Sequence, residues 1–183
     1  MGDDEQLVAQ ALAGRDAAFS ELVDRYQARV LRFLVTRSAS LADAEDALQD
    51  TLMNAYRYLA SFDPRWRFST WLYRIAIRAA AKQPRAQWSP AADAADPAAD
   101  PLAACIVAGE RENLWLTARR VLPGDMYTAM WLFYVEELTL KEVGQALDRS
   151  LPWVKVTLYR GRNRLQHALR EQPARCKESK AYG

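Results

Sequence analysis

The chain has 183 residues, half of them apolar, and a net charge of +2. This length suffices for one core or for two small helical domains. No apolar run approaches the length of a membrane span and the acidic N-terminal segment lacks a signal-peptide pattern, so we expect a cytoplasmic protein. Cys105, Cys176 and His167 provide neither a disulfide framework nor a zinc site, and we expect no metal and no cofactor.

The small net charge is the sum of one acidic block and two basic blocks, together with the rest of the chain. Residues 1–60 hold six basic and ten acidic side chains, a net charge of −4, whereas residues 61–90 hold six basic and one acidic, a net charge of +5. Residues 139–170 again carry +5, from seven basic and two acidic side chains. These blocks indicate one acidic surface for a protein partner and two basic surfaces for nucleic acid.

The first third of the chain is predicted to be helical because glycine and proline are nearly absent before Pro64. A short helix is expected over Asp4–Ala13 and should end at Gly14, followed by a longer helix that Asp16 can cap. The apolar side chains of the longer helix have helical spacing and are interpreted as core residues: Phe19, Leu22, Val23, Tyr26, Val30, Phe33 and Leu34.

Ser40 and Asp43 resemble a capping box and predict a helix that runs to about Leu59. Its inward residues would be Ala44, Ala47, Leu48, Leu52, Ala55 and Leu59. Its outer face would carry Glu45, Asp46, Gln49 and Asp50. Acids near a helix N-terminus favour the macrodipole, but Asp50 lies well past the first turn. We therefore interpret the outer face as a docking surface for a basic partner.

The next segment, residues 61–69, alternates cations with aromatic rings: Arg65 and Arg67 with Trp66 and Phe68. Ser69 is expected to cap a helix from Thr70 to about Gln83. Its core side would contain Leu72, Ile75, Ala76 and Ala79, and its basic stripe Arg74, Arg78 and Lys82, with Trp71 on the same flank.

Aromatic rings beside a cationic track are typical of single-stranded nucleic-acid binding. Rings stack on unpaired bases for about 1–3 kcal/mol per base, while the cations follow the phosphates. The alternative, that Phe68 and Trp71 are simply core residues, stays open at this point.

Residues 84–109 are rich in alanine, proline and aspartate, which predicts a flexible, mildly acidic linker. We therefore expect an all-α protein with two small helical domains, residues 1–84 and 110–172, joined by a linker over 85–109 and followed by a frayed tail over 173–183. The second domain should begin with helices over 110–122 and 125–135, separated by Pro123 and Gly124. In the second of these helices, Met130 and either Phe133 or Tyr134 would face inward.

Residues 139–165 have the pattern of a helix-turn-helix. Its first helix has an apolar stripe of Leu140, Val143 and Leu147, and its turn contains Asp148 and Arg149, where aspartate tolerates a left-handed backbone. Ser150 would cap the second helix, with Pro152 in its first turn. That helix would bury Val154, Leu158 and Leu165 and expose Lys155, Arg160, Arg162 and Arg164. This arrangement favours major-groove recognition over a merely basic surface hairpin.

Three segments of this sequence together resemble bacterial RNA polymerase sigma factors of the extracytoplasmic-function (ECF) group within the sigma-70 family. They are residues 43–50 (DAEDALQD), residues 68–76 (FSTWLYRIA), and residues 140–147 (LKEVGQAL) with Val154, Lys155 and Arg160. They occur in the order found in that family and span both expected domains. The combination is specific, whereas a helix-turn-helix alone occurs in many regulators.

The resemblance implies a role for each surface. The acidic helix would dock on the clamp helices of the largest subunit of core RNA polymerase, through Glu45, Asp46, Gln49 and Asp50. The aromatic loop and the helix after it would capture melted minus-ten promoter DNA, through Arg65, Trp66, Arg67, Phe68, Trp71, Arg74, Arg78 and Lys82. The helix-turn-helix would bind the minus-thirty-five element, through Ser150, Trp153, Lys155, Thr157, Tyr159, Arg160 and Arg164. The resemblance also implies an anti-sigma factor as a partner, which in this family is often membrane-anchored.

Two functions of other classes compete with this interpretation. A two-domain helix-turn-helix regulator that never enters polymerase would need neither the acidic face at 45–50 nor the aromatic loop at 62–68. An enzyme acting on nucleic acid is disfavoured, because the sequence has no paired His/Cys ligands, no phosphate-binding glycine loop and no nucleophile beside a base.

Overall fold

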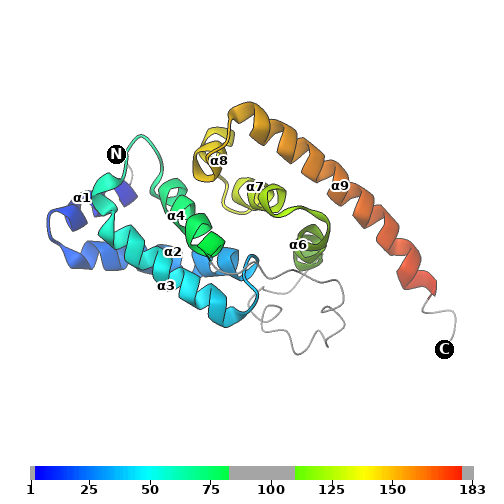
Figure 1. Ribbon diagram of the computed structural model, residues 1–183, viewed down its shortest axis with the longest axis horizontal. Coiled ribbons are helices and arrows are strands. Elements are labelled where there is room, and N and C mark those ends of the chain that lie inside the picture. The colour runs from blue at the N-terminus through cyan, green and yellow to red at the C-terminus, as the bar shows by residue number, and fades with distance from the viewer. Residues whose placement is uncertain (1–2, 83–109, 179–183) are drawn as a thin grey trace.

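The computed structural model describes residues 3–82 and 110–178, and all regular elements within these ranges are helices. They form two groups that lie side by side: α1 to α4 in one, and α6 to α9 in the other (Figure 1). The all-α prediction is therefore confirmed. Residues 83–109, which contain the expected linker and Cys105, lie outside the described residues, so the predicted domain boundaries there stay a prediction.

The first group contains α1 (Asp3–Leu12), α2 (Asp16–Val35), α3 (Leu41–Arg57), a short 3-10 helix (Leu59–Ser61) and α4 (Phe68–Lys82). Helices α2, α3 and α4 pack against one another around fully buried side chains: Leu22, Val30, Phe33, Leu34, Ala44, Ala47, Leu72 and Tyr73. Gly14, with φ +88°, makes the tight turn between α1 and α2. The helices thus follow the predicted order, and α3 ends slightly before the predicted Leu59.

One of the three predicted caps in this group is present and two are wrong. Ser40 caps α3, because its Oγ accepts a hydrogen bond from the Asp43 amide at 3.1 Å. Asp16 makes no capping bond, since its carboxylate instead accepts a hydrogen bond from the Tyr56 hydroxyl at 3.1 Å. Ser69 cannot cap α4, because that helix already begins at Phe68 and Ser69 is buried in its first turn.

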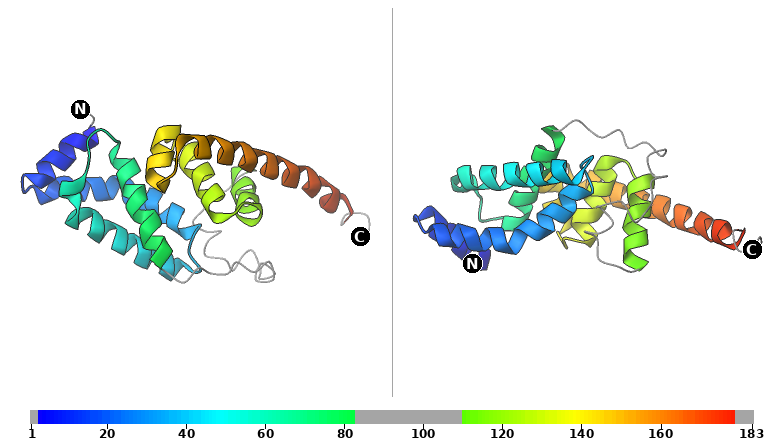
Figure 2. Two further views of the ribbon diagram at one scale, coloured as in Figure 1. Left: turned by 45° about the horizontal axis from the view of Figure 1, so that its top comes forward. Right: turned by 90° about the horizontal axis from the view of Figure 1, so that it is seen from below.

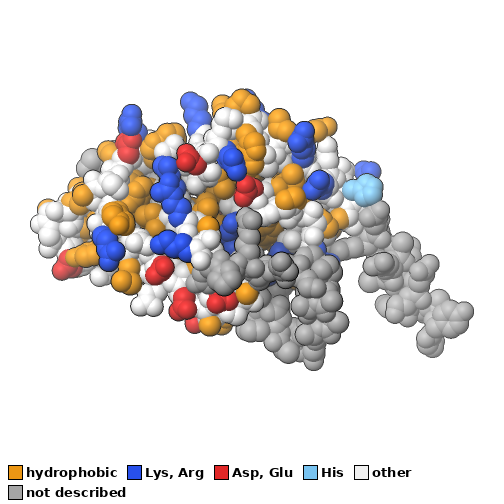
Figure 3. Space-filling view, viewed as in Figure 1, with side chains coloured by type: hydrophobic (Ala, Val, Ile, Leu, Met, Phe, Trp, Pro, Cys, Tyr) orange, Lys and Arg blue, Asp and Glu red, His pale blue; other side chains and the backbone are white. Residues whose placement is uncertain are grey.

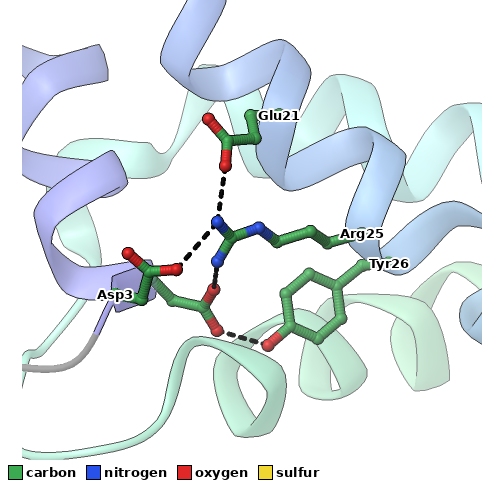
Figure 4. Close-up of polar contacts among 5 residues, drawn as sticks. Asp3, Glu21, Arg25 and Tyr26 are labelled. Carbon is green, nitrogen blue, oxygen red and sulfur yellow. Dashed lines mark hydrogen bonds and ion pairs between the residues drawn. The ribbon is translucent and has the colours of Figure 1, made fainter.

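Helix α1 is attached to α2 by a cluster of charged side chains (Figure 4). The Arg25 guanidinium lies 2.5 Å from Glu21, 2.8 Å from Asp3 and 3.0 Å from Asp4. The hydrogen bond to Glu21, followed by that to Asp3, raises the pKa of Arg25, so it remains a cation throughout the ordinary pH range. The Tyr26 hydroxyl also donates a hydrogen bond to Asp4. This cluster joins α1 to the helix that carries much of the core.

The second group contains α6 (Glu110–Val121), α7 (Gly124–Tyr134), α8 (Leu140–Leu147) and α9 (Leu151–Glu178). Of the two alternatives for the inner face of α7, Phe133 is half-buried and Tyr134 is exposed, so Phe133 faces inward. Helix α9 continues past Pro173 to Glu178, which corrects the frayed tail predicted over 173–178.

The two groups are packed together, with α4 against α8 (Figure 1). The further views in Figure 2 show α8 beside α4 again, with α9 extending away from the rest of the molecule. Among the described helices, none combines the length and the apolar character needed to cross a membrane. Within the same ranges, no cluster of His, Cys, Asp and Glu side chains could hold a metal ion.

Candidate nucleic-acid and polymerase interfaces

The outer face of α3 is acidic and open to solvent, as predicted. Glu45, Asp46, Gln49 and Asp50 are all exposed. The opposite face of the helix is buried through Ala44, Ala47, Thr51 and Ala55, while Leu48 and Leu52 are half-buried. In the view of Figure 3, acidic side chains gather over α3 and basic ones over α4 and α9. The core therefore does not use the acidic face, which is free to contact a partner.

A pocket of about 650 Å³ lies where the end of α3, the loop after it and α4 meet. It contains five of the side chains predicted to bind minus-ten DNA: Trp66, Trp71, Arg74, Arg78 and Lys82. Sequence analysis missed the others that line it, which include Asn54, Tyr58, Asp63, Thr70 and Ile75. Asn54 and Tyr58 are spaced i and i+4 near the end of α3, and this spacing is the one signal in the sequence that places them together.

The two aromatic residues of the loop have different environments. Trp66 is half-buried at the pocket, so part of its ring is available to a ligand. Phe68 is 2% exposed and packs against Tyr26, Phe62 and Trp71, with ring-centroid distances of 5.4, 5.9 and 5.7 Å. Phe68 is therefore a core residue, one of the two alternatives that the sequence left open, because α4 starts at this residue and turns the ring inward.

Trp71 combines the two roles that the sequence left open. Its ring packs against Phe62 and Phe68, with centroids 5.8 and 5.7 Å away, and it also lines the pocket. A ring that is already packed on one side can present its other face to a base without losing further rotamer freedom on binding. Trp71 is thus both a packing residue and a wall of the pocket.

The cations of this region differ in what they contact. Arg78 and Lys82 are exposed and line the pocket. Arg65 is paired with Asp63 at 2.6 Å, and this interaction lowers the pKa of the Asp63 carboxyl. Arg67 does not line the pocket; its guanidinium donates to the backbone oxygen of Glu137 in the second group at 3.3 Å.

The helix-turn-helix has the predicted turn geometry. Asp148 adopts the left-handed conformation, with φ 57°, and ends α8. Ser150 Oγ accepts a hydrogen bond from the Trp153 amide at 3.4 Å in the first turn of α9. Thr139 and Glu142 add a capping box at the start of α8. A Cβ on Gly144 would lie 2.8 Å from a backbone oxygen of the turn, so the close approach of α8 to the turn requires glycine.

The predicted recognition helix exposes most of the side chains assigned to minus-thirty-five DNA. Lys155, Tyr159, Arg160 and Arg164 are exposed, as are Ser150 and Arg162. Trp153 is half-buried, with the Arg149 guanidinium 5.3 Å from its ring centroid.

Thr157 is 7% exposed, so it does not lie on the exposed side of the helix with the other side chains assigned to DNA. It lies on the same face as Val154, Leu158 and Leu165, which are buried as predicted. Gly161, one turn later, is also buried and lets α7 approach closely, since a Cβ there would lie 3.0 Å from Met130 Sδ. The spacing of Thr157 and Gly161 at i and i+4 was the available signal for this inward face.

A buried carboxylate between the two groups of helices was not predicted. Glu136 follows α7, and its side chain is 1% exposed. Its Oε2 accepts hydrogen bonds from Arg29 Nη2 at 2.8 Å and Nε at 3.1 Å, while Trp131 Nε1 donates to Oε1 at 3.3 Å. Burial, and then the negative charge of Glu136, raises the pKa of Tyr73 in α4. The adjacent Glu137 is exposed, and no periodic pattern in the sequence distinguishes the two acids.

Comparison with known proteins gives matches over nearly the whole chain. Residues 22–89 match the family described as sigma-70 region 2. The ECF RNA polymerase sigma-E factor of Escherichia coli K12 is 31% identical over 178 residues, which cover 90% of this chain and 93% of that protein. The ECF RNA polymerase sigma factor SigW of Bacillus subtilis is 30% identical over 180 residues, covering 90% of this chain and 95% of that protein.

Two solved structures share this fold. CnrH, in complex with the cytosolic domain of CnrY, superposes with a TM-score of 0.66 and 24% identity, covering 92% of this chain and 97% of that chain. The sigma factor RpoE of Bartonella quintana, in complex with the anti-sigma factor NepR, gives a TM-score of 0.65 and 21% identity, covering 83% and 96% respectively. At these identities the likeness supports the helical fold.

Proposed function

Because the chain belongs to the ECF family of RNA polymerase sigma factors, we propose that it binds core RNA polymerase and directs transcription initiation at specific promoters. The observation that carries this proposal is the 31% identity to a sigma-E factor over 90% of the chain, which includes both groups of helices. The protein would recognise the minus-thirty-five element and melt the minus-ten element. This role places it in the cytoplasm with the polymerase and requires no catalytic chemistry of its own.

Each exposed surface has a place in this function. The acidic face of α3 would dock on the clamp helices of the largest polymerase subunit, through Glu45, Asp46, Gln49 and Asp50. The pocket and the cations around it would hold melted minus-ten DNA, through Arg65, Trp66, Arg67, Trp71, Arg74, Arg78 and Lys82. The exposed side of α9 and the turn before it would contact the minus-thirty-five element, through Ser150, Trp153, Lys155, Tyr159, Arg160 and Arg164. Phe68 and Thr157 are left out because they are buried.

The pocket has the chemistry that an extruded base requires. Taking a base out of the stack costs a few kcal/mol, which stacking and hydrogen bonds in a pocket must offset. Trp66 and Trp71 offer ring faces, Asn54 offers a polar group, and Arg78 on the rim can contact a phosphate. We further propose an anti-sigma factor as the regulatory partner, on the ground of family membership.

Transcription reconstituted from purified core RNA polymerase, this protein and a library of promoter fragments tests the function. We expect transcripts from a restricted set of fragments only when the protein is added. Tight binding to duplex promoter DNA without polymerase, together with no transcript from any fragment, would instead favour a helix-turn-helix regulator that does not enter polymerase.

A charge reversal tests the docking surface within the same assay. Asp46→Lys with Asp50→Lys should abolish binding to core polymerase in a pull-down and should leave the thermal unfolding temperature unchanged, since both side chains are exposed. Asp24→Lys is the control, because it reverses an exposed carboxylate of α2 that lies outside the acidic face of α3, and it should bind normally. Unchanged binding of the first variant would show that the acidic face is only solvated.

A further inference from the structure

Val156 of α9 is an apolar side chain that is open to solvent. It is 47% exposed, whereas Val154 and Leu158, two residues before and after it, are buried. A helix turns by about 100° per residue, so Val156 points about 160° away from each of them. Helix α9 packs against α6, α7 and α8 and lies along the outside of the second group (Figure 1). Val156 therefore lies near the middle of the solvent-facing side of α9.

This solvent-facing side is uncharged along its middle and basic on its flanks. Tyr159, three residues after Val156, is 60% exposed, and Asn163 is exposed one turn further on. Lys155 and Arg160, both exposed, lie on opposite flanks of this row. When such a helix enters the major groove, long cationic side chains on the flanks can reach phosphates or base edges. The middle lies deepest in the groove, where a short side chain reaches only base edges.

The first turns of α9 are held in place, which defines the position of Val156. The Ser150 hydroxyl accepts a hydrogen bond from the Trp153 amide at 3.4 Å. The Arg149 guanidinium lies 5.3 Å from the Trp153 ring centroid and 3.2 Å from the Asp125 carboxylate of α7. Recognition helices present the residues near their N-terminus to base edges, and Val156 lies within the first two turns of α9. Val156 thus occupies the place of a base contact, which sequence analysis did not assign to it.

A valine side chain can favour only one of the four bases in the major groove. Its isopropyl group neither donates nor accepts a hydrogen bond, so a polar base edge pressed against it loses water without a replacement. Thymine differs, because its C5-methyl group is an apolar feature of the groove. Valine also has one strongly preferred χ1 rotamer in a helix, so the contact costs little rotamer freedom.

We propose that Val156 determines specificity at one position of the minus-thirty-five element, by packing its isopropyl group against the methyl group of a thymine. The inference rests on the proposed function. Cytosine lacks the methyl group, and both purines present the polar N7 atom in the groove, so all three other bases are disfavoured at that position.

The test uses the full chain bound to core RNA polymerase. Selection from the promoter library gives the preferred minus-thirty-five element. Each thymine of that element, on either strand, is then replaced singly by deoxyuridine, which removes the methyl group and keeps every hydrogen-bonding atom. Competition binding measures the affinity of each duplex for wild type, for Val156→Ala and for Lys155→Ala. The last variant is the matched control, because it weakens binding from the neighbouring position without removing the apolar contact.

At one thymine, deoxyuridine should weaken wild-type binding about fourfold, the effect of one methyl group removed from water. The control should show the same ratio from a weaker starting affinity. Val156→Ala should bind the two duplexes equally. The unfolding temperature of Val156→Ala should match that of the wild type, since the side chain is exposed and alanine is the better helix former.

Three results would overturn the proposal: an element without thymine on either strand, no thymine at which deoxyuridine weakens wild-type binding, or an equal loss for wild type and Val156→Ala at every thymine. If the wild type nevertheless transcribes from the selected promoters, only the role of Val156 is wrong. If the wild type gives no transcript from any fragment of the library, the proposed function is wrong and this inference fails with it.

Discussion

Replacing Phe68 with alanine should strongly destabilise the first group of helices, whereas replacing Trp66 should change its stability little. The Phe68 side chain is 2% exposed and contacts three other rings, so its removal leaves a cavity that the core cannot easily fill. Phe→Ala substitutions at such sites cost about 3–5 kcal/mol. Because each aromatic pair adds about 0.5–1.5 kcal/mol beyond its buried area, we expect a loss near the upper end of that range.

This loss is large compared with the stability available. A domain of this size has a free energy of unfolding on the order of 4–12 kcal/mol, and each kcal/mol shifts the unfolding temperature of a small domain by about 4–8 °C. Phe68→Ala should therefore lower the unfolding temperature by about 15 °C or more, measured by circular dichroism. Trp66→Ala removes a half-buried ring at the pocket and should shift it by only a few degrees.

The defect of Trp66→Ala should instead appear in promoter opening. Loss of one stacked base costs about 1–3 kcal/mol, which is about 5- to 150-fold in the equilibrium for promoter opening. Trp66→Ala should still form a promoter complex with polymerase but should give weak permanganate reactivity of thymines in the minus-ten region. A template with a pre-melted bubble should restore part of the transcription. The reasoning is refuted if folded Trp66→Ala opens linear DNA at the normal rate, or if Phe68→Ala melts at the wild-type temperature.

Three further predictions concern the second group of helices and the interface. Lys155→Ala should weaken binding to the minus-thirty-five element by about 1–3 kcal/mol and relax specificity at one base position. Arg164→Ala should weaken binding to all promoters alike. Affinities measured on a set of single-base promoter variants distinguish the two outcomes. Gly144→Ala should destabilise the helix-turn-helix by about 1–3 kcal/mol because its Cβ would lie 2.8 Å from a backbone oxygen, and Gly124→Ala, with nothing within 4 Å of its Cβ, should not; urea unfolding measures both. Burial raises the pKa of Tyr73, so the unfolded chain releases a proton above about pH 10 that the folded chain keeps, and stability falls as pH rises. For Tyr73→Phe, the free energy of unfolding measured with urea should fall less than that of the wild type between about pH 9.5 and 11.5. An equal fall in the two proteins would contradict the assignment.

The sequence by itself determined the features that depend on neighbouring residues along the chain. Helix order followed from apolar spacing, the start of α3 followed from Ser40, and the turn of the helix-turn-helix followed from Asp148 and Ser150. These features arise from hydrogen bonds and steric limits within about four residues, so a single sequence contains the information for them. Family membership was likewise visible in short segments whose order is fixed along the chain.

Only the tertiary structure decided which of two similar neighbouring residues is buried. Phe68 and Trp66 look alike in an aromatic loop, yet only Phe68 enters the core, because the first turn of α4 directs it toward Tyr26. Glu136 and Glu137 are adjacent acids, yet only Glu136 is covered, because Arg29, from a helix more than a hundred residues earlier, lies opposite it. Burial depends on which distant helix packs across a residue, and no local pattern contains that information. The pairing of Arg67 and Arg74 with the helix-turn-helix follows from the same packing.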